Sequence, residues 1–91
     1  MINEAQKIQL SRHAGIRCSQ RSISLAGIDF VLEYGTARPC GRGCESYSFD
    51  RRSWDAAIAA YGARIVGLER YRNLYAIMSA DGAIVTAAWK H

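Results

Sequence analysis

Near the start of the chain, apolar positions recur every three or four residues, which predicts two short helices. Ser11 can cap a first helix over 12–21, because a serine hydroxyl accepts a hydrogen bond from the first helical turn. Ser24 can cap a second helix over 25–34, and Gly35 can end it. The apolar side chains expected to face the core here are those of Leu10, Ala14, Cys18, Leu25, Ile28, Val31 and Leu32.

Strand-like alternation occurs in two segments outside these helices. Residues 7–10 alternate polar and apolar side chains, which suits a short strand or an extended lead-in. Residues 45–49 alternate as well and predict a strand, with Tyr47 and Phe49 facing inward. Residues 36–43 hold the only proline of the chain and two glycines, which predicts a loop.

A third helix is predicted in the middle of the chain, with Asp50 as its cap. Its apolar stripe recurs at steps of four, three, four and three: Trp54, Ile58, Tyr61, Ile65 and Leu68. Gly62 and Gly67 each weaken a continuous helix by about 1 kcal/mol. A kink near Gly62 and a division into two short helices therefore both stay open.

The end of the chain predicts a β-hairpin, because residues 73–79 and 83–89 flank Asp81-Gly82, a favoured two-residue turn. The pairs expected on its apolar face are Met78 with Val85, Ala76 with Ala87, and Leu74 with Trp89. The opposite face is mixed and carries Tyr75, Ile77, Ile84, Thr86, Ala88 and Lys90. The predicted fold is α+β: two N-terminal helices and a third central helix packed on a small antiparallel sheet that ends in this C-terminal hairpin.

Length and composition predict a single domain spanning residues 1–91. The chain is 49% hydrophobic, which suffices for a core of its own. No apolar run approaches the roughly 20 residues that cross a bilayer, and the N-terminus lacks the form of a signal peptide. We therefore expect a cytoplasmic protein without a membrane partner. Ten of the twelve basic residues are arginine and the net charge is +4, which fits an RNA, DNA or acidic-protein partner or a solvated basic surface.

The three cysteines, Cys18, Cys40 and Cys44, argue against a disulfide framework, because their number is odd. Cys40 and Cys44 have a loop-like spacing and can bind zinc only with help from Cys18 or His13. A second close pair of ligands is missing. We therefore predict reduced thiols, with Cys18 in the core, and neither a metal nor a cofactor.

His13, Arg17 and Arg21 form a basic stripe on the first helix. Their spacing of four and four places them on one helical face. Two guanidinium groups can hold a phosphate, and an imidazole can exchange a proton near neutral pH. These three are the candidate catalytic residues. The candidate substrate-binding residues, on the mixed face of the hairpin, are Tyr75, Thr86 and Lys90.

Two non-catalytic roles stay open for this basic stripe. It can bind a partner without chemistry, or it can help to build the fold. In the structural role, the arginines pair with acidic side chains and fix the helix packing. The acids considered for this role are Asp29, Glu33 and Glu45.

The segment Ser11-x-His13-Ala14-x-x-Arg17-x-x-x-Arg21-x-Ile23-Ser24 resembles a bacterial family of unknown function. Its members open with His-Ala-x-x-Arg-x-x-x-Arg-Gly-Ile, continue with a helix ending in Leu-Glu-x-Gly, and finish on a hairpin. The matching parts of this chain are Leu32-Glu33-Tyr34-Gly35, Asp81-Gly82 and Ile84-Val85-Thr86. Ser22 departs from the family's usual glycine. The resemblance covers about residues 7–90.

By fold, this family is similar to small toxin ribonucleases of the RelE and BrnT kind. The resemblance implies a metal-independent ribonuclease of a toxin–antitoxin or mobile-element system, with RNA or a nucleoprotein as substrate and an antitoxin as partner. The alternative is a non-catalytic basic module, or a small phage- or plasmid-encoded inhibitor that binds nucleic acid, a nucleoprotein or an acidic protein. A homodimer stays open, because no residue pattern argues for or against one.

Overall fold

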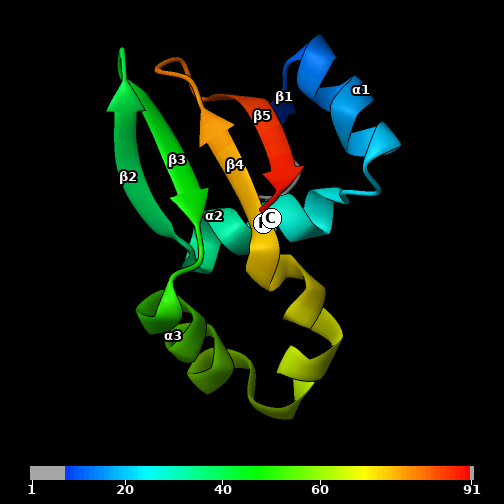
Figure 1. Ribbon diagram of the computed structural model, residues 1–91, viewed down its shortest axis with the longest axis vertical. Coiled ribbons are helices and arrows are strands. Elements are labelled where there is room, and N and C mark those ends of the chain that lie inside the picture. Colours follow the sequence, from blue (N-terminus) through cyan, green and yellow to red (C-terminus); the bar gives the residue numbers. More distant parts are fainter. Residues whose placement is uncertain (1–7, 91) are drawn as a thin grey trace, which may run out of the picture.

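A five-stranded mixed sheet organises residues 8–90, the part of the chain that the computed structural model describes (Figure 1). The strands are β1 (Gln9–Leu10), β2 (Thr36–Gly41), β3 (Cys44–Ser48), β4 (Leu74–Met78) and β5 (Ala83–Trp89). Their order is β1-β5-β4-β3-β2. Neighbouring strands are antiparallel except for β1, which runs parallel to β5. The α+β class is confirmed, and the sheet is mixed rather than purely antiparallel.

Helices cover one face and one end of this sheet. They are α1 (Arg12–Gln20), α2 (Leu25–Tyr34), α3 (Arg51–Tyr61) and the 3₁₀ helix η2 (Gly62–Asn73). α2 crosses behind β4 in Figure 1 and packs on β2, β3 and β4, while α1 packs on β5 and β1. α3 and η2 pack on each other and on α2. Within residues 8–90, no helix has the length and apolar character needed to cross a membrane.

The predicted helix caps are confirmed. Ser11 Oγ accepts a hydrogen bond from the Ala14 amide at 3.0 Å, and Ser24 Oγ accepts one from the Gly27 amide at 3.0 Å. α1 ends at Gln20, one residue before the predicted end, and α2 has the predicted bounds. These caps are local contacts between residues three positions apart, which is why the sequence pattern locates them.

α3 begins with a capping box. Asp50 Oδ1 accepts a hydrogen bond from the Ser53 amide at 2.8 Å, and Ser53 Oγ accepts one from the Asp50 amide at 2.9 Å. The helix stops at Gly62, whose φ of 59° is in the left-handed region that glycine tolerates best. Of the two open alternatives, the division into two helices is the one that the chain adopts, with η2 as the second.

The core lies between the sheet and the helices and contains fully or nearly fully buried side chains from every helix except η2. The largest fully buried side chains are Ile28, Leu74, Ile84 and Val31. The prediction for Leu25 is wrong, because its side chain is 50% exposed. Phe30 is buried instead, since its ring lies 5.0 Å from the ring of Phe49 and 6.0 Å from that of Trp54, measured between centroids.

The predicted loop over 36–43 is wrong, because residues Thr36–Gly41 form β2. This strand pairs with β3 and lies at the edge of the sheet. An edge position tolerates Pro39, whose missing N–H would otherwise interrupt a ladder of hydrogen bonds. The two strands join through a tight turn in which Arg42 and Gly43 have φ values of 54° and 78°.

The C-terminal hairpin forms, but its register changes near the turn. Leu74 pairs with Trp89 and Ala76 with Ala87 as predicted, whereas Met78 pairs with Ile84 and not with Val85. A β-bulge therefore lies in β5, and the extra residue moves Ile84 into the core, where it is fully buried. The connection spans residues 79–82 rather than two residues, and it is closed by the Ser79 amide, which donates to the Ala83 carbonyl at 2.8 Å.

Candidate functional site

The basic stripe does not stay together as one surface. His13 and Arg17 are exposed on α1, and no hydrogen bond or ion pair of either side chain is found within residues 8–90. Arg21 caps the end of α1 and is half-buried. Its Nη1 donates to the Ala87 carbonyl of β5 at 3.1 Å. The stripe is therefore divided, with two residues facing solvent and one turned toward the sheet.

The short length of β1 explains why Arg21 reaches β5. β1 pairs only with Ala83 and Ile84, so this edge of β5 has no strand partner further along. Arg21 donates to the Ala87 carbonyl there, and Trp89 Nε1 donates in return to the Arg21 carbonyl at 2.8 Å. The two bonds fasten the end of α1 to β5. Arg21 does fix helix packing, but it does so through a backbone carbonyl. Within residues 8–90 it forms no ion pair with any of the three acids considered for this role.

A hollow of about 720 Å³ lies next to this junction and is lined by Arg21, Tyr75, Ala88, Trp89 and Lys90. Its size is within the range of sites for small molecules and nucleotides. The structure thus brings together one candidate catalytic residue, Arg21, and two candidate substrate-binding residues, Tyr75 and Lys90. Thr86 is half-buried beside Ile77 on the neighbouring strand and is not among the residues that line the hollow.

Arg70 and Tyr71 support the hollow from η2. The Tyr71 ring is stacked on the Trp89 ring, with centroids 6.2 Å apart and planes inclined by 13°. The Arg70 guanidinium lies 5.4 Å from both ring centroids, and its Nη2 donates to the Ser22 carbonyl at 3.1 Å. Arg70 was not among the candidate site residues, because nothing in a local pattern shows that η2 meets the end of β5.

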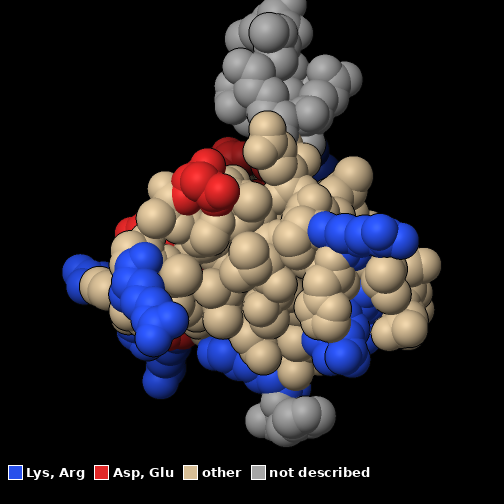
Figure 2. Space-filling view, turned by 90° about the horizontal axis from the view of Figure 1, so that it is seen from above, with Lys and Arg blue, Asp and Glu red and all other residues tan. Residues whose placement is uncertain are grey.

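Charge is unevenly distributed over the surface. Figure 2 looks down on the molecule from the top of Figure 1, with acidic side chains gathered toward one side and basic side chains at the flanks and opposite side. Within residues 8–90 the one ion pair joins Arg38 Nη2 to Asp50 Oδ2 at 3.0 Å. Most arginines therefore keep their full charge available to a partner.

The cysteines do not converge on a metal site. Cys18 is buried in the core, whereas Cys40 is exposed on the β2–β3 hairpin and Cys44 is half-buried there. In the described part of the chain, no three side chains of His, Cys, Asp or Glu are placed to hold a metal together. Burial raises the pKa of the Cys18 thiol, and the charge of Arg21 opposes this in part. Cys18 therefore stays a protonated core side chain.

No family model, curated protein or solved structure matches this chain. The resemblance to the family with the His-Ala-x-x-Arg signature stays a prediction.

Proposed function

We propose that the protein binds single-stranded RNA in the hollow formed by Arg21, Tyr75, Ala88, Trp89 and Lys90. The observation that carries this proposal is that two cations and two aromatic rings line one surface hollow. Cationic groups that follow the backbone, combined with rings on which bases stack, are the means by which proteins hold single strands. The guanidinium of a third cation, Arg70, lies 5.4 Å from the centroid of the Trp89 ring.

The phosphate contacts would come from Arg21 and Lys90. Arg21 uses Nη1 for the Ala87 carbonyl, which holds the guanidinium in place and leaves its other N–H groups for a ligand. Lys90 is exposed and supplies a mobile ammonium. The ring of Tyr75 is half-buried, so it can stack on a base at a small cost in conformational freedom.

The test of RNA binding is fluorescence anisotropy with a labelled single-stranded RNA over a series of salt concentrations. We expect Lys90→Ala to reduce the slope of log affinity against log salt by about 0.7, the value for one lost phosphate contact on a single strand. Tyr75→Ala should weaken binding about tenfold, since it removes one stacked base.

Arg52→Ala is the matched control, because Arg52 is exposed in the first turn of α3 and its loss changes the net charge equally. If Arg52→Ala and Lys90→Ala weaken binding to the same extent, the basic surface acts as a whole and the hollow is not the site. Binding that does not depend on salt would contradict the proposal as well.

A second candidate function is metal-independent cleavage of the bound RNA. It is favoured by the grouping of a guanidinium, a phenol and an ammonium in one hollow, namely Arg21, Tyr75 and Lys90. Arg21 would stabilise the charged phosphorane as the 2′-oxygen attacks phosphorus. Tyr75, as the phenolate, would accept the proton of the 2′-hydroxyl, and the Lys90 ammonium would donate a proton to the leaving 5′-oxygen. His13 is not among the residues that line the hollow, so in this proposal it takes no part in the chemical step.

Cleavage is tested by incubating RNA with the protein in the presence of a chelator. We expect Tyr75→Phe to abolish product formation while RNA binding persists, and His13→Ala to retain activity. If His13→Ala alone loses activity, the chemical step takes place at the exposed face of α1 and not in the hollow. If the wild-type protein leaves RNA intact and cells that express it grow normally, the proposed cleavage is contradicted. The proposed RNA binding would be unaffected by that result.

The hollow also suits an inhibitory protein partner. An antitoxin or other acidic protein that places carboxylates against Arg21 and Lys90 would exclude RNA by occupying the same cations. Such a partner is expected to compete with labelled RNA in the anisotropy measurement.

A further inference from the structure

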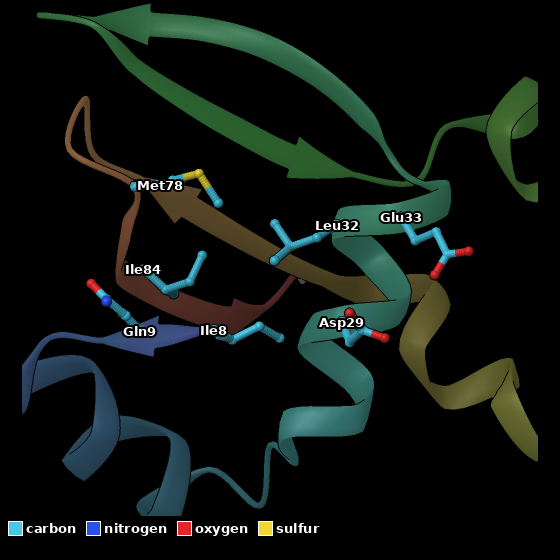
Figure 3. A pocket seen from close by; sticks show the side chains of 8 residues that line it. Ile8, Gln9, Asp29, Leu32, Glu33, Met78 and Ile84 are labelled. Carbon is cyan, nitrogen blue, oxygen red and sulfur yellow. The ribbon is translucent and has the colours of Figure 1, made fainter. Parts of the chain in front are cut away.

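A second cavity, of about 460 Å³, lies between α2, β1 and the β4–β5 hairpin (Figure 3). We call it the acidic cavity. It is lined by Ile8, Gln9, Asp29, Leu32, Glu33, Met78, Gly82 and Ile84. None of these residues lines the Arg21 hollow, so the two are separate sites. No local pattern in the sequence predicts this cavity, because its walls come from four separate segments of the chain.

The floor of the acidic cavity is apolar. Figure 3 shows Leu32 pointing from α2 toward Ile84 and Met78 of the sheet, with Ile8 beside Ile84. Ile84 is fully buried, whereas Leu32 and Met78 are half-buried and so leave part of their apolar surface open to the cavity. A surface of this kind holds the hydrocarbon part of a ligand.

The α2 side of the cavity carries two carboxylates, Asp29 and Glu33. They stand four residues apart and therefore on the same face of the helix. Asp29 is half-buried and Glu33 is exposed at the rim. Within residues 8–90, neither side chain has an ion pair, although the chain as a whole carries a net charge of +4. Two negative charges that have no ion pair within residues 8–90, beside an apolar floor, favour a ligand that is both cationic and apolar.

We propose that the acidic cavity binds a small organic cation, that is, an apolar body that carries a protonated amine. The apolar body would contact the open surfaces of Leu32 and Met78, which lie over the buried Ile84, and the ammonium would be held by Asp29, with Glu33 adding a second charge at the rim. The volume is within the range of sites for small molecules. An anion of the same shape is excluded by the carboxylates, and a fully polar polyamine leaves the floor unused.

Three probes of similar shape test the proposal in NMR titrations of the full chain: phenethylamine, phenethyl alcohol and hydrocinnamate. They present an ammonium, a hydroxyl and a carboxylate on the same ring and short chain. We expect phenethylamine to bind most tightly and to shift the Met78 methyl and Leu32 signals. Phenethyl alcohol should bind more weakly, and hydrocinnamate should not bind measurably.

Substitutions of the carboxylates separate charge recognition from apolar contact. Asp29→Asn should weaken phenethylamine binding about fivefold and leave phenethyl alcohol binding unchanged, because only the ammonium loses its partner. Glu33→Gln, at the rim, should act in the same direction with a smaller effect. Asp55→Asn is the control, since Asp55 is an exposed carboxylate on α3 and does not line the cavity.

Three results would overturn the proposal. The first is equal affinity for the amine and the alcohol, which would show that the cavity does not recognise charge. The second is the same change in Asp29→Asn and Asp55→Asn, which would indicate only a general effect of net charge. The third is a set of shifts around Trp89 and Lys90 rather than around Met78, which would place the probe in the other hollow.

Discussion

At the scale of single residues, Arg21 combines a structural contact with a place in the candidate RNA site. Its guanidinium bonds the Ala87 carbonyl at 3.1 Å and also lines the hollow beside Tyr75 and Lys90. A side chain held in this way approaches a phosphate with little loss of conformational entropy. The same contact means that a substitution of Arg21 alone cannot separate binding from stability, which is why the RNA experiments rest on Lys90 and Tyr75.

We predict that Arg21→Ala lowers the free energy of unfolding by about 1 kcal/mol, because one partly buried hydrogen bond is lost. Arg17→Ala is the matched control. Arg17 lies one turn earlier on α1 and is exposed, so its substitution should change stability by less than about 0.5 kcal/mol. Urea denaturation of both variants measures the difference. Equal effects would show that the contact between Arg21 and β5 contributes nothing to stability.

The carboxyl group of Asp50 is expected to make the stability of the protein depend on pH. Hydrogen bonds from the Ser53 amide and hydroxyl, followed by one from Thr36, lower the pKa of Asp50 to about 2 from its ordinary value of 3.8. A carboxyl with a lower pKa in the folded state favours folding above pH 3.8, and this contribution is lost as the pH falls toward 2.

We therefore expect Asp50→Asn to lower Tm by about 5 °C at neutral pH, and the gap from the wild type to close between about pH 4 and pH 2. Thermal unfolding followed by circular dichroism across this range measures both values. Asp55→Asn, which removes an exposed carboxyl of the same helix, should show no such convergence. A gap that stays constant with pH would contradict the assigned role of the carboxylate.

At the scale of elements, the contact between α2 and η2 depends on a glycine. A Cβ atom at Gly27 would overlap with Tyr71 Cε1 and lie 2.8 Å from Tyr71 Cδ1. The ring of Tyr71 is held on its other sides by Trp89, on which it stacks, and by Ser24, whose hydroxyl is 2.9 Å from the Tyr71 hydroxyl. The absence of a side chain at Gly27 therefore sets how closely η2 approaches α2.

We predict that Gly27→Ala destabilises the protein by about 1–3 kcal/mol, through displacement of Tyr71, and weakens RNA binding by disturbing Trp89. Gly15→Ala is the matched control, because a Cβ there meets no atom within 4 Å. In α1 the added methyl group should stabilise the protein by about 0.4–1 kcal/mol, since alanine favours a helix more than glycine does. Chemical denaturation of both variants measures whether each substitution raises or lowers the free energy of unfolding. A stabilising Gly27→Ala would mean that α2 and η2 can separate freely.

The elements also differ in how far local sequence predicts them. Ser11, Ser24 and Asp50 cap their helices through contacts three residues away, so the pattern located all three. β2 was missed because its strand conformation depends on pairing with β3 and on an edge position that tolerates Pro39. Likewise the bulge that places Ile84 in the core is a property of the paired strands, and a strict alternation of faces assigns Ile84 to the wrong side.

At the scale of the whole molecule, the two candidate sites have opposite charge and share no lining residue. Arg21 and Lys90 line one of them, and Asp29 and Glu33 the other. We predict that saturating phenethylamine changes the affinity for RNA by less than about twofold, because exposed charges on separate surfaces are largely screened at physiological salt. Anisotropy in the presence and absence of the amine measures this. A large change would mean that the amine reaches the Arg21 hollow, or that the two sites are coupled.

The sequence by itself determined the α+β class, the helix caps and the apolar faces of most elements, because these depend on residues within one helical turn or on strand periodicity. It also singled out Arg21, Tyr75 and Lys90. Only the tertiary structure decided that these three meet, since Arg21 finds its partner Ala87 across 66 residues of chain. It also left His13 and Arg17 on an exposed face and opened the acidic cavity. Contacts of that range follow from how the elements pack, and no local spacing encodes them.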